Sequence, residues 1–144
     1  MSTTTLGVIG TGAVGLAVAR RAVDAGLNVV LSNSRGPETL AGLVAELGER
    51  AHAATPAEAA SAGDLVIASV PLAAHEQLPR AELAGKTVID PMNYAPRPGW
   101  RIPELDSNKM TSSELVQRHL AGAQVVKALQ CIGMKQLVDL SLPA

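Results

Sequence analysis

Aromatic residues are nearly absent from this chain of 144 residues, which contains no phenylalanine, one tryptophan and one tyrosine. A hydrophobic core must therefore be built from alanine, valine, leucine and isoleucine. The hydrophobic content of 47% and the length are sufficient for one such core. A single cysteine excludes a disulfide within the chain and fits a reducing compartment. These shortages predict a single globular domain in a cytoplasmic protein.

An excess of charge of one sign is also missing. Twelve Lys and Arg against thirteen Asp and Glu give a formal net charge of −1, which provides no basic field for nucleic acid or an anionic membrane surface. No run approaches the roughly 20 apolar residues of a membrane span. The first ten residues lack the basic start of a signal peptide. No cluster of His, Cys and acidic residues has metal-ligand spacing. We expect no nucleic-acid, membrane or metal partner.

Apolar runs alternate with helical patterns along the whole sequence. Strands are predicted at 6–9, 28–31, 51–54, 64–71, 87–90 and 124–129, the last as a buried strand. Helices are predicted from the glycine-rich turn after the first strand to residue 26, and at 38–47, 56–63, 73–83 and 111–120. This alternation predicts an α/β, Rossmann-type, doubly wound and mostly parallel sheet with the strand order 3-2-1-4-5-6. We expect one domain over 1–144, with 130–144 as a short tail.

A glycine motif joins the first predicted strand to the first helix. Gly10, Gly12 and Gly15 stand in the spacing GxGxxG. In this strand–turn–helix context, the first glycine allows a tight turn, the second lets a pyrophosphate approach the backbone, and the third lets helix and strand pack closely. The helix N-terminus adds unpaired N–H groups that attract phosphate. The motif predicts a dinucleotide-binding turn.

The end of the second strand indicates which dinucleotide binds. NAD-binding proteins usually place Asp or Glu about 20 residues after the glycines. Here Ser32 occupies that position, and the first acidic residue that follows is Glu38. Ser32, Ser34 and Arg35 instead supply hydroxyl groups and a guanidinium, which suit a 2′-phosphate. The sequence therefore predicts NADP(H) as the cofactor.

Ligands of doubly wound sheets bind at the carboxyl ends of the strands, where the strand order reverses. This rule gathers five segments around one crevice: 10–12, 32–35 (with Asn33), 69–71 (Ser69, Val70 and Pro71), 90–93 and 128–131. We expect a small-molecule partner there. The stretch 91–110 holds four prolines and one tryptophan, and Trp100 is either a lid residue or a hydrophobic anchor.

Several segments together resemble a known family, the NADP oxidoreductases that use the deazaflavin coenzyme F420 and their bacterial NADPH-dependent relatives. The matching segments are GTGAVG, SNSRGPETL, SVP, IDPMNYAPRPG, TSSELVQRHL and VVKAL, and they span nearly the whole chain. The resemblance implies direct hydride transfer between NADPH and the deazaflavin ring, without a catalytic acid or base.

The resemblance also implies a role for individual residues. It implies adenosine 2′-phosphate contacts at Ser32, Ser34 and Arg35, pyrophosphate contacts at Thr11, Gly12, Ala13 and Val14, and a nicotinamide wall of Val70 and Pro71 with Ala128 nearby. His75 is the best placed of three isolated histidines for proton transfer, although a lone histidine is more often a surface or capping residue.

The second substrate is less well defined by the sequence. Members of the family continue beyond the last strand seen here, and Leu129-Gln130-Cys131 departs from the family pattern after VVKA. Coenzyme F420 is the first-choice hydride acceptor, and a small imine or ketone is the alternative within enzymes. A non-catalytic NADP-binding module or subunit is the alternative outside them. Cys131 is expected to be a small buried hydrophobe.

The apolar tail predicts self-association. The tail contains four apolar residues within six positions, and it follows a strand that should form the edge of the sheet. These residues are Leu137, Val138, Leu140 and Leu142. An apolar tail beside an exposed edge strand is unfavourable in a monomer. We therefore expect a two-fold homodimer in which edge and tail bury each other.

Overall fold

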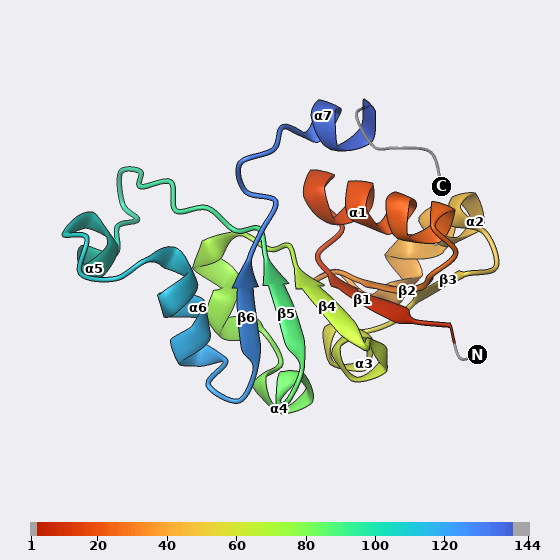
Figure 1. Ribbon diagram of the computed structural model, residues 1–144, viewed down its shortest axis with the longest axis horizontal. Helices are drawn as coiled ribbons and strands as arrows, with labels where there is room; N and C mark the ends of the chain where they lie inside the picture. Colours follow the sequence, from red (N-terminus) through yellow and green to blue (C-terminus); the bar gives the residue numbers. More distant parts are fainter. Residues whose placement is uncertain (1–2, 140–144) are drawn as a thin grey trace.

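Six parallel strands form one sheet in the order β3-β2-β1-β4-β5-β6 (Figure 1). The structure, a computed structural model, describes residues 3–139, except for the side chain of Met134. The strands are β1 (Thr5–Ile9), β2 (Asn28–Ser32), β3 (Ala51–Ala53), β4 (Leu65–Ala68), β5 (Thr87–Asp90) and β6 (Gln124–Lys127). Every neighbouring pair is parallel. The predicted doubly wound order is confirmed.

Helices cover both faces of this sheet (Figure 1). They are α1 (Ala13–Asp24), the 3₁₀ helix η1 (Pro37–Leu40), α2 (Ala41–Leu47), α3 (Pro56–Ala62), the 3₁₀ helix η2 (Leu72–Gln77), α4 (Arg80–Leu83), α5 (Pro103–Asp106), α6 (Ser112–His119) and α7 (Met134–Asp139). Helices α1 and α2 contribute to one hydrophobic core, and α3, η2, α4 and α6 contribute to the other. Within residues 3–139, none of these helices is long and apolar enough to cross a membrane.

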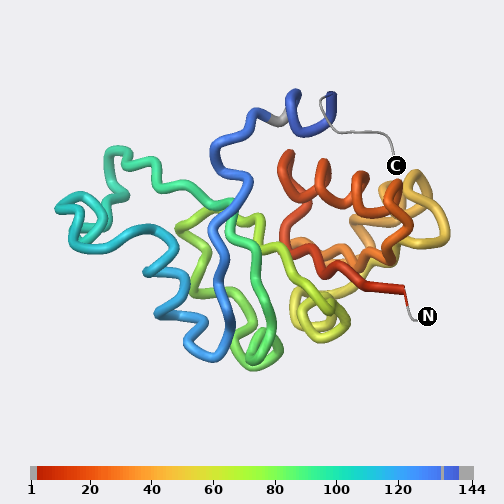
Figure 2. Tube along the Cα trace, in the orientation of Figure 1, coloured from red at the N-terminus to blue at the C-terminus, as the bar shows by residue number. Residues whose placement is uncertain are grey.

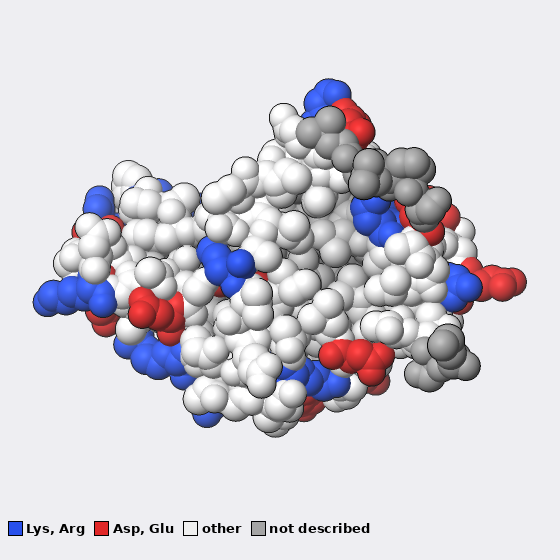
Figure 3. All heavy atoms as spheres, viewed as in Figure 1, with Lys and Arg blue, Asp and Glu red and all other residues white. Residues whose placement is uncertain are grey.

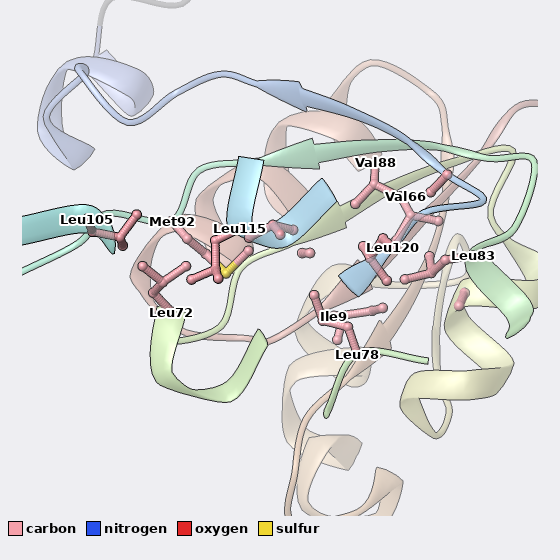
Figure 4. Packing of buried hydrophobic residues seen from close by; sticks show 14 residues of the cluster. Ile9, Val66, Leu72, Leu78, Leu83, Val88, Met92, Leu105, Leu115 and Leu120 are labelled. Atoms are coloured by element: carbon pink, nitrogen blue, oxygen red, sulfur yellow. The ribbon is translucent and has the colours of Figure 1, made fainter. Parts of the chain in front are cut away.

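The two cores consist almost wholly of aliphatic side chains, as the lack of aromatic residues requires. Val8, Val29 and Leu31 are fully buried beneath α1 and α2. On the opposite face, Leu83 and Leu120 lie in the cluster drawn in Figure 4. Charged side chains of both signs are interspersed over the face shown in Figure 3, in keeping with the small net charge.

The prediction of one helix over 73–83 is wrong. The chain instead forms η2, breaks at Leu78, and restarts as α4. The break comes from Pro79, because a proline disfavours the helical conformation of the residue before it. Leu78 accordingly has extended dihedrals, φ −63° and ψ 137°. The tighter 3₁₀ helix changes which residues face the same way, and this determines one wall of the site described below.

Specific contacts order the proline-rich stretch between β5 and α6. The Tyr94 hydroxyl donates to Asp106 Oδ1 (2.9 Å) and accepts from the Ile102 N–H (2.9 Å). Arg101 Nε donates to Asp106 Oδ2 at 2.8 Å, and this hydrogen bond lowers the pKa of the Asp106 carboxyl. Trp100 stacks edge-on against Tyr94 with ring centroids 5.4 Å apart, and both pack on the hydrophobic core. Trp100 is therefore an anchor of this stretch.

Strand β6 is shorter and more exposed than predicted. It ends at Lys127, its residues alternate between exposed and half-buried, and Val126 is 47% exposed. The reason is its position at the edge of the sheet, where β5 is its one neighbouring strand among the described residues. The Gln117 side chain covers part of that edge by accepting a hydrogen bond from the Val125 N–H at 3.0 Å.

After β6 the chain crosses to α1, where α7 lies alongside it (Figures 1 and 2). Arg21 Nη2 donates a hydrogen bond to the Val138 carbonyl. Cys131 on this crossing is exposed, so the expectation that it is buried is wrong. Leu140 and Leu142 lie outside the described residues, and the homodimer stays a prediction.

An ion pair between buried Asp90 and half-buried Lys127 joins β5, β6 and α6. Asp90 is fully buried, and its carboxylate accepts from the Met92 N–H and from the Ser113 hydroxyl, each at 2.8 Å. Lys127 Nζ lies 3.5 Å from Asp90 Oδ2 and donates to Ser112 Oγ at 3.2 Å. Every polar atom of Asp90 thus has a partner, and the carboxylate connects three elements at the carboxyl end of the sheet.

We predict that Asp90→Ala lowers the free energy of unfolding by about 1–3 kcal/mol, because it leaves the Met92 N–H and the Ser113 hydroxyl without their buried acceptor. Urea unfolding measures the loss. The matched control is Glu46→Ala, which removes the exposed partner of Arg20 and should cost less than about 1 kcal/mol. A loss no larger than that of the control would show that the ion pair does not stabilise this end of the sheet.

Candidate functional site

The turn between β1 and α1 is defined by two very close backbone contacts. Gly10 has a φ of +97°, and a Cβ atom there would lie 2.1 Å from the Ser69 carbonyl oxygen. A Cβ atom at Gly15 would lie 2.0 Å from the Gly10 carbonyl oxygen. Both positions therefore require glycine, the first for a positive φ and both for lack of space. The turn fits tightly between the end of β4 and the start of α1.

Gly12 differs from these two glycines. It is the N-cap of α1 with an extended conformation, φ −72° and ψ −170°, and a Cβ atom there would meet nothing within 4 Å. The space above Gly12 is therefore open. The first N–H groups of α1 have no acceptor within the helix, and Gly12 has no side chain to cap them. Ala13 and Val14 are the first two residues of α1, so two of these N–H groups are theirs. The Val14 side chain itself packs against the core. This arrangement suits an anion.

A cavity of about 810 Å³ opens beside this turn at the carboxyl edge of the sheet. Its volume lies within the range of about 300–1,000 Å³ that is usual for small-molecule sites. Loops after four neighbouring strands and the helix η2 line it: Ile9, Gly10, Thr11, Gly12, Asn33, Ser34, Arg35, Gly36, Thr55, Pro56, Ser69, Val70, Pro71, Ala74, Gln77 and Leu78. The predicted crevice thus exists, but 90–93 and 128–131 do not line it.

Ser32 does not take the position expected of it. Its side chain is fully buried, and its hydroxyl donates to the Val8 carbonyl at 3.0 Å. Its own carbonyl accepts from the Gly10 N–H at 2.9 Å. As the last residue of β2, Ser32 points into the structure and fixes the glycine turn to the second strand. It therefore contributes no side chain to the cavity, contrary to the predicted phosphate contact.

Asn33 shapes the loop that follows. Its Oδ1 accepts from the N–H groups of Arg35 and Gly36, at 2.9 and 3.0 Å, and its Nδ2 donates to Thr39 Oγ1 at 2.9 Å. Because these three hydrogen bonds use the Asn33 carboxamide and fix the loop, Ser34 and Arg35 lie at the surface of the cavity. Among residues 3–139, no ion pair or hydrogen bond engages the Arg35 guanidinium. Arg35 and Ser34 are therefore available to an anionic ligand.

The opposite wall follows β4, with Ser69, Val70 and Pro71 in the lining as predicted. Ala128 follows β6 and does not reach the cavity, because β5 separates β6 from β4. His75 lies behind this wall. Its side chain is buried, and its Nδ1–H donates to the Leu72 carbonyl at 2.9 Å. The structure therefore places His75 away from the position proposed for proton transfer.

Besides Ile9 and Gly36, which adjoin predicted segments, five further lining residues were not identified from the sequence: Thr55, Pro56, Ala74, Gln77 and Leu78. Thr55 and Pro56 follow β3 at the same edge, and the rule that found the other loops would have found them. Ala74 and Gln77 depend on the 3₁₀ geometry of η2, and Leu78 on the break that follows it. Because the sequence predicts an α-helix there, it does not indicate that Ala74 and Gln77 face the same way.

The family model described as NADP oxidoreductase, coenzyme F420-dependent, matches residues 5–94. The matched region includes the glycine turn, the loop that carries Arg35 and the wall after β4. The chain belongs to this family. No curated protein sequence matches it. The family resemblance expected from the sequence is therefore confirmed.

Several solved structures are similar to this chain. A hypothetical protein from Sinorhizobium meliloti is 30% identical, with a TM-score of 0.78, over 95% of this chain and 66% of that chain. A protein from Arthrobacter sp. FB24 that is assigned as an F420-dependent NADP reductase is 27% identical, with a TM-score of 0.79, over 96% and 67%. A reductive aminase from Aspergillus terreus, in complex with NADPH, is 26% identical, with a TM-score of 0.60, over 88% and 40%. The chain thus spans about two thirds of the first two proteins.

The contrast between Gly12 and Gly15 leads to a prediction about folding. Gly15→Ala should lower the melting temperature strongly, because its methyl group would overlap the Gly10 carbonyl oxygen. Gly12→Ala should leave the melting temperature nearly unchanged, because the added methyl group enters open space. Thermal unfolding followed by circular dichroism compares the two variants. Equal melting temperatures would contradict the backbone contact between α1 and the turn.

Proposed function

We propose that this chain binds NADP(H) in the cavity and takes part in hydride transfer between NADP(H) and a second substrate, with coenzyme F420 as the first choice. One observation carries the proposal. The open N-terminus of α1 at Gly12 and the unpaired guanidinium of Arg35 line the same cavity. Two separate anion-binding positions in one cavity suit a dinucleotide that carries both a pyrophosphate and a 2′-phosphate.

The charge of the cavity supports NADP(H) over NAD(H). None of the described lining residues is acidic, and Arg35 is the one lining residue with a full charge. A carboxylate, which would accept hydrogen bonds from a free ribose and repel a phosphate, is missing from the lining. The Ser34 hydroxyl and the Arg35 guanidinium can together donate to a 2′-phosphate. With the pyrophosphate over Gly12, the nicotinamide would lie toward Val70 and Pro71.

The lining also bears on the kind of reaction. Bound NADPH supplies a hydride from its nicotinamide ring, and the protein has to hold that ring and the acceptor in position. The described lining contains no Asp, Glu, His, Lys or Cys, so catalysis by positioning suits it better than general acid–base catalysis. This favours the deazaflavin, whose ring delocalises the charge that the hydride brings and can take its proton on nitrogen from solvent, over a ketone or imine, which needs a proton on oxygen or nitrogen as the hydride arrives.

Two alternatives follow from specific observations. The likeness to a reductive aminase, at 26% identity, supports a small imine or ketone as the acceptor. The absence of an acidic or basic catalytic side chain from the described lining also suits a non-catalytic NADP-binding module or subunit.

An acceptor assay tests the proposal. The purified chain is mixed with NADPH and with oxidised coenzyme F420, a cyclic imine or a ketone, and the loss of NADPH absorbance is followed. We expect turnover with coenzyme F420. Turnover with the imine or ketone alone would support the reductase alternative. NADPH binding without turnover of any acceptor would support the binding module.

Cofactor selectivity gives a separate prediction. The chain should bind NADPH at least about tenfold more tightly than NADH, and Arg35→Ala should remove about 1.5–3 kcal/mol of NADPH binding, a typical cost for a charge-assisted contact. NADH affinity should change little, because NADH lacks the 2′-phosphate. Calorimetry measures both ligands, with Arg20→Ala on α1 as the control outside the cavity. Equal affinity of the unmodified chain for NADPH and NADH would overturn the assignment.

A further inference from the structure

The helix η2 presents a row of side chains to the cavity at every third position. Pro71 (the N-cap), Ala74 and Gln77 line the cavity, whereas Leu72 and His75 are buried; the chain leaves the helix at Leu78, which is buried and also borders the cavity. A 3₁₀ helix has three residues per turn, so residues three apart lie directly above one another. An α-helix over the same residues would turn these side chains progressively apart. The row is therefore a consequence of the 3₁₀ conformation.

Contacts on the buried side hold this row in place. The His75 ring donates to the Leu72 carbonyl at 2.9 Å, and the His119 Nε2–H donates to the Leu78 carbonyl at 3.0 Å. The two rings meet edge to face with centroids 6.0 Å apart. Leu72 and Leu78 belong to the core cluster in Figure 4, where Leu78 lies near Ile9 at the end of β1. Gln77 is thus carried by a wall fixed at both ends.

Gln77 carries the free carboxamide of the cavity. The Asn33 carboxamide is used by the turn after β2. The Thr55 hydroxyl donates to Glu58 Oε2 at 2.8 Å and accepts from the Glu58 N–H at 3.3 Å, within the cap of α3. Among residues 3–139, no hydrogen bond engages the exposed side chain of Gln77. It offers one acceptor and two donors in one plane.

Resting on the proposed binding of NADP(H), we propose that Gln77 recognises the adenine base and makes the cavity selective for adenine over hypoxanthine. With the 2′-phosphate at Ser34 and Arg35, we place the base of the same ribose against a wall of Pro56, Ala74 and Gln77, which line the same cavity. The apolar residues of that wall suit the faces of a purine ring. The Gln77 carboxamide accepts from the 6-amino group and donates to N7, a pairing that fits glutamine and adenine. Hypoxanthine presents two acceptors on that edge and cannot match it.

The experiment uses half-cofactors, so that the second substrate plays no part. Binding of adenosine 2′,5′-bisphosphate and inosine 2′,5′-bisphosphate is measured by calorimetry for the unmodified chain, Gln77→Leu and Gln124→Ala. The unmodified chain should prefer the adenosine compound by about tenfold or more. Gln77→Leu, which keeps a similar size, should bind both compounds equally. Gln124→Ala, at an exposed glutamine of β6 outside the cavity, should keep the preference.

Each outcome decides a different point. Equal binding of the two compounds by the unmodified chain, or a preference that persists in folded Gln77→Leu, would overturn the role of Gln77 while the proposed NADP(H) site stands. Failure of the unmodified chain to bind either compound would overturn the proposed site and the role of Gln77 with it. Circular dichroism verifies that Gln77→Leu is folded.

Discussion

The contact of backbone against backbone around Gly10 is the constraint on which the site depends. The Gly10 Cα lies against the Ser69 carbonyl, and the Gly15 Cα lies against the Gly10 carbonyl, with no room for a methyl group at either place. These contacts bring the end of β1, the end of β4 and the first turn of α1 together at the centre of the sheet. Because the turn is so close to β4, the helix N-terminus opens toward the cavity.

The remaining parts of the site are fixed by polar groups that are themselves not available to a ligand. Ser32 holds the turn to β2, and Asn33 bends the next loop so that Arg35 stays at the cavity surface. On the opposite side, His75 and His119 hold η2. Buried hydrogen bonds of this kind fix the positions of neighbouring groups because an unmade bond inside the protein is costly. Among residues 3–139, no side-chain hydrogen bond engages Ser34, Arg35 or Gln77, and all three line the cavity.

The two halves of the sheet have different roles in this picture. Strands β1 to β4 supply the loops that line the cavity. Strands β5 and β6 are tied to α6 by Asp90 and Lys127, and their ends do not enter the cavity lining. The segments 90–93 and 128–131 satisfy the general rule for doubly wound sheets, in that they stand at the carboxyl edge. They do not contact the cavity because they lie beyond β4, whereas the cavity opens over the ends of β3, β2, β1 and β4.

The sequence by itself determined the class of fold, the order of the strands and the glycine turn. These features depend on local spacing: apolar runs, caps such as Thr55 with Glu58, and glycines at fixed intervals. It also indicated Arg35, because a charged group after the second strand is visible without coordinates. Only the tertiary structure decided which side chains are free. Ser32 and Ser34 have the same side chain and stand two positions apart. The Ser32 hydroxyl nevertheless donates to the Val8 carbonyl, whereas Ser34 lines the cavity. The direction of Ala74 and Gln77 was likewise decided by the 3₁₀ conformation of η2. The physical reason is that a hydrogen-bond partner depends on neighbours distant in sequence, and the direction of a side chain depends on the type of helix that carries it.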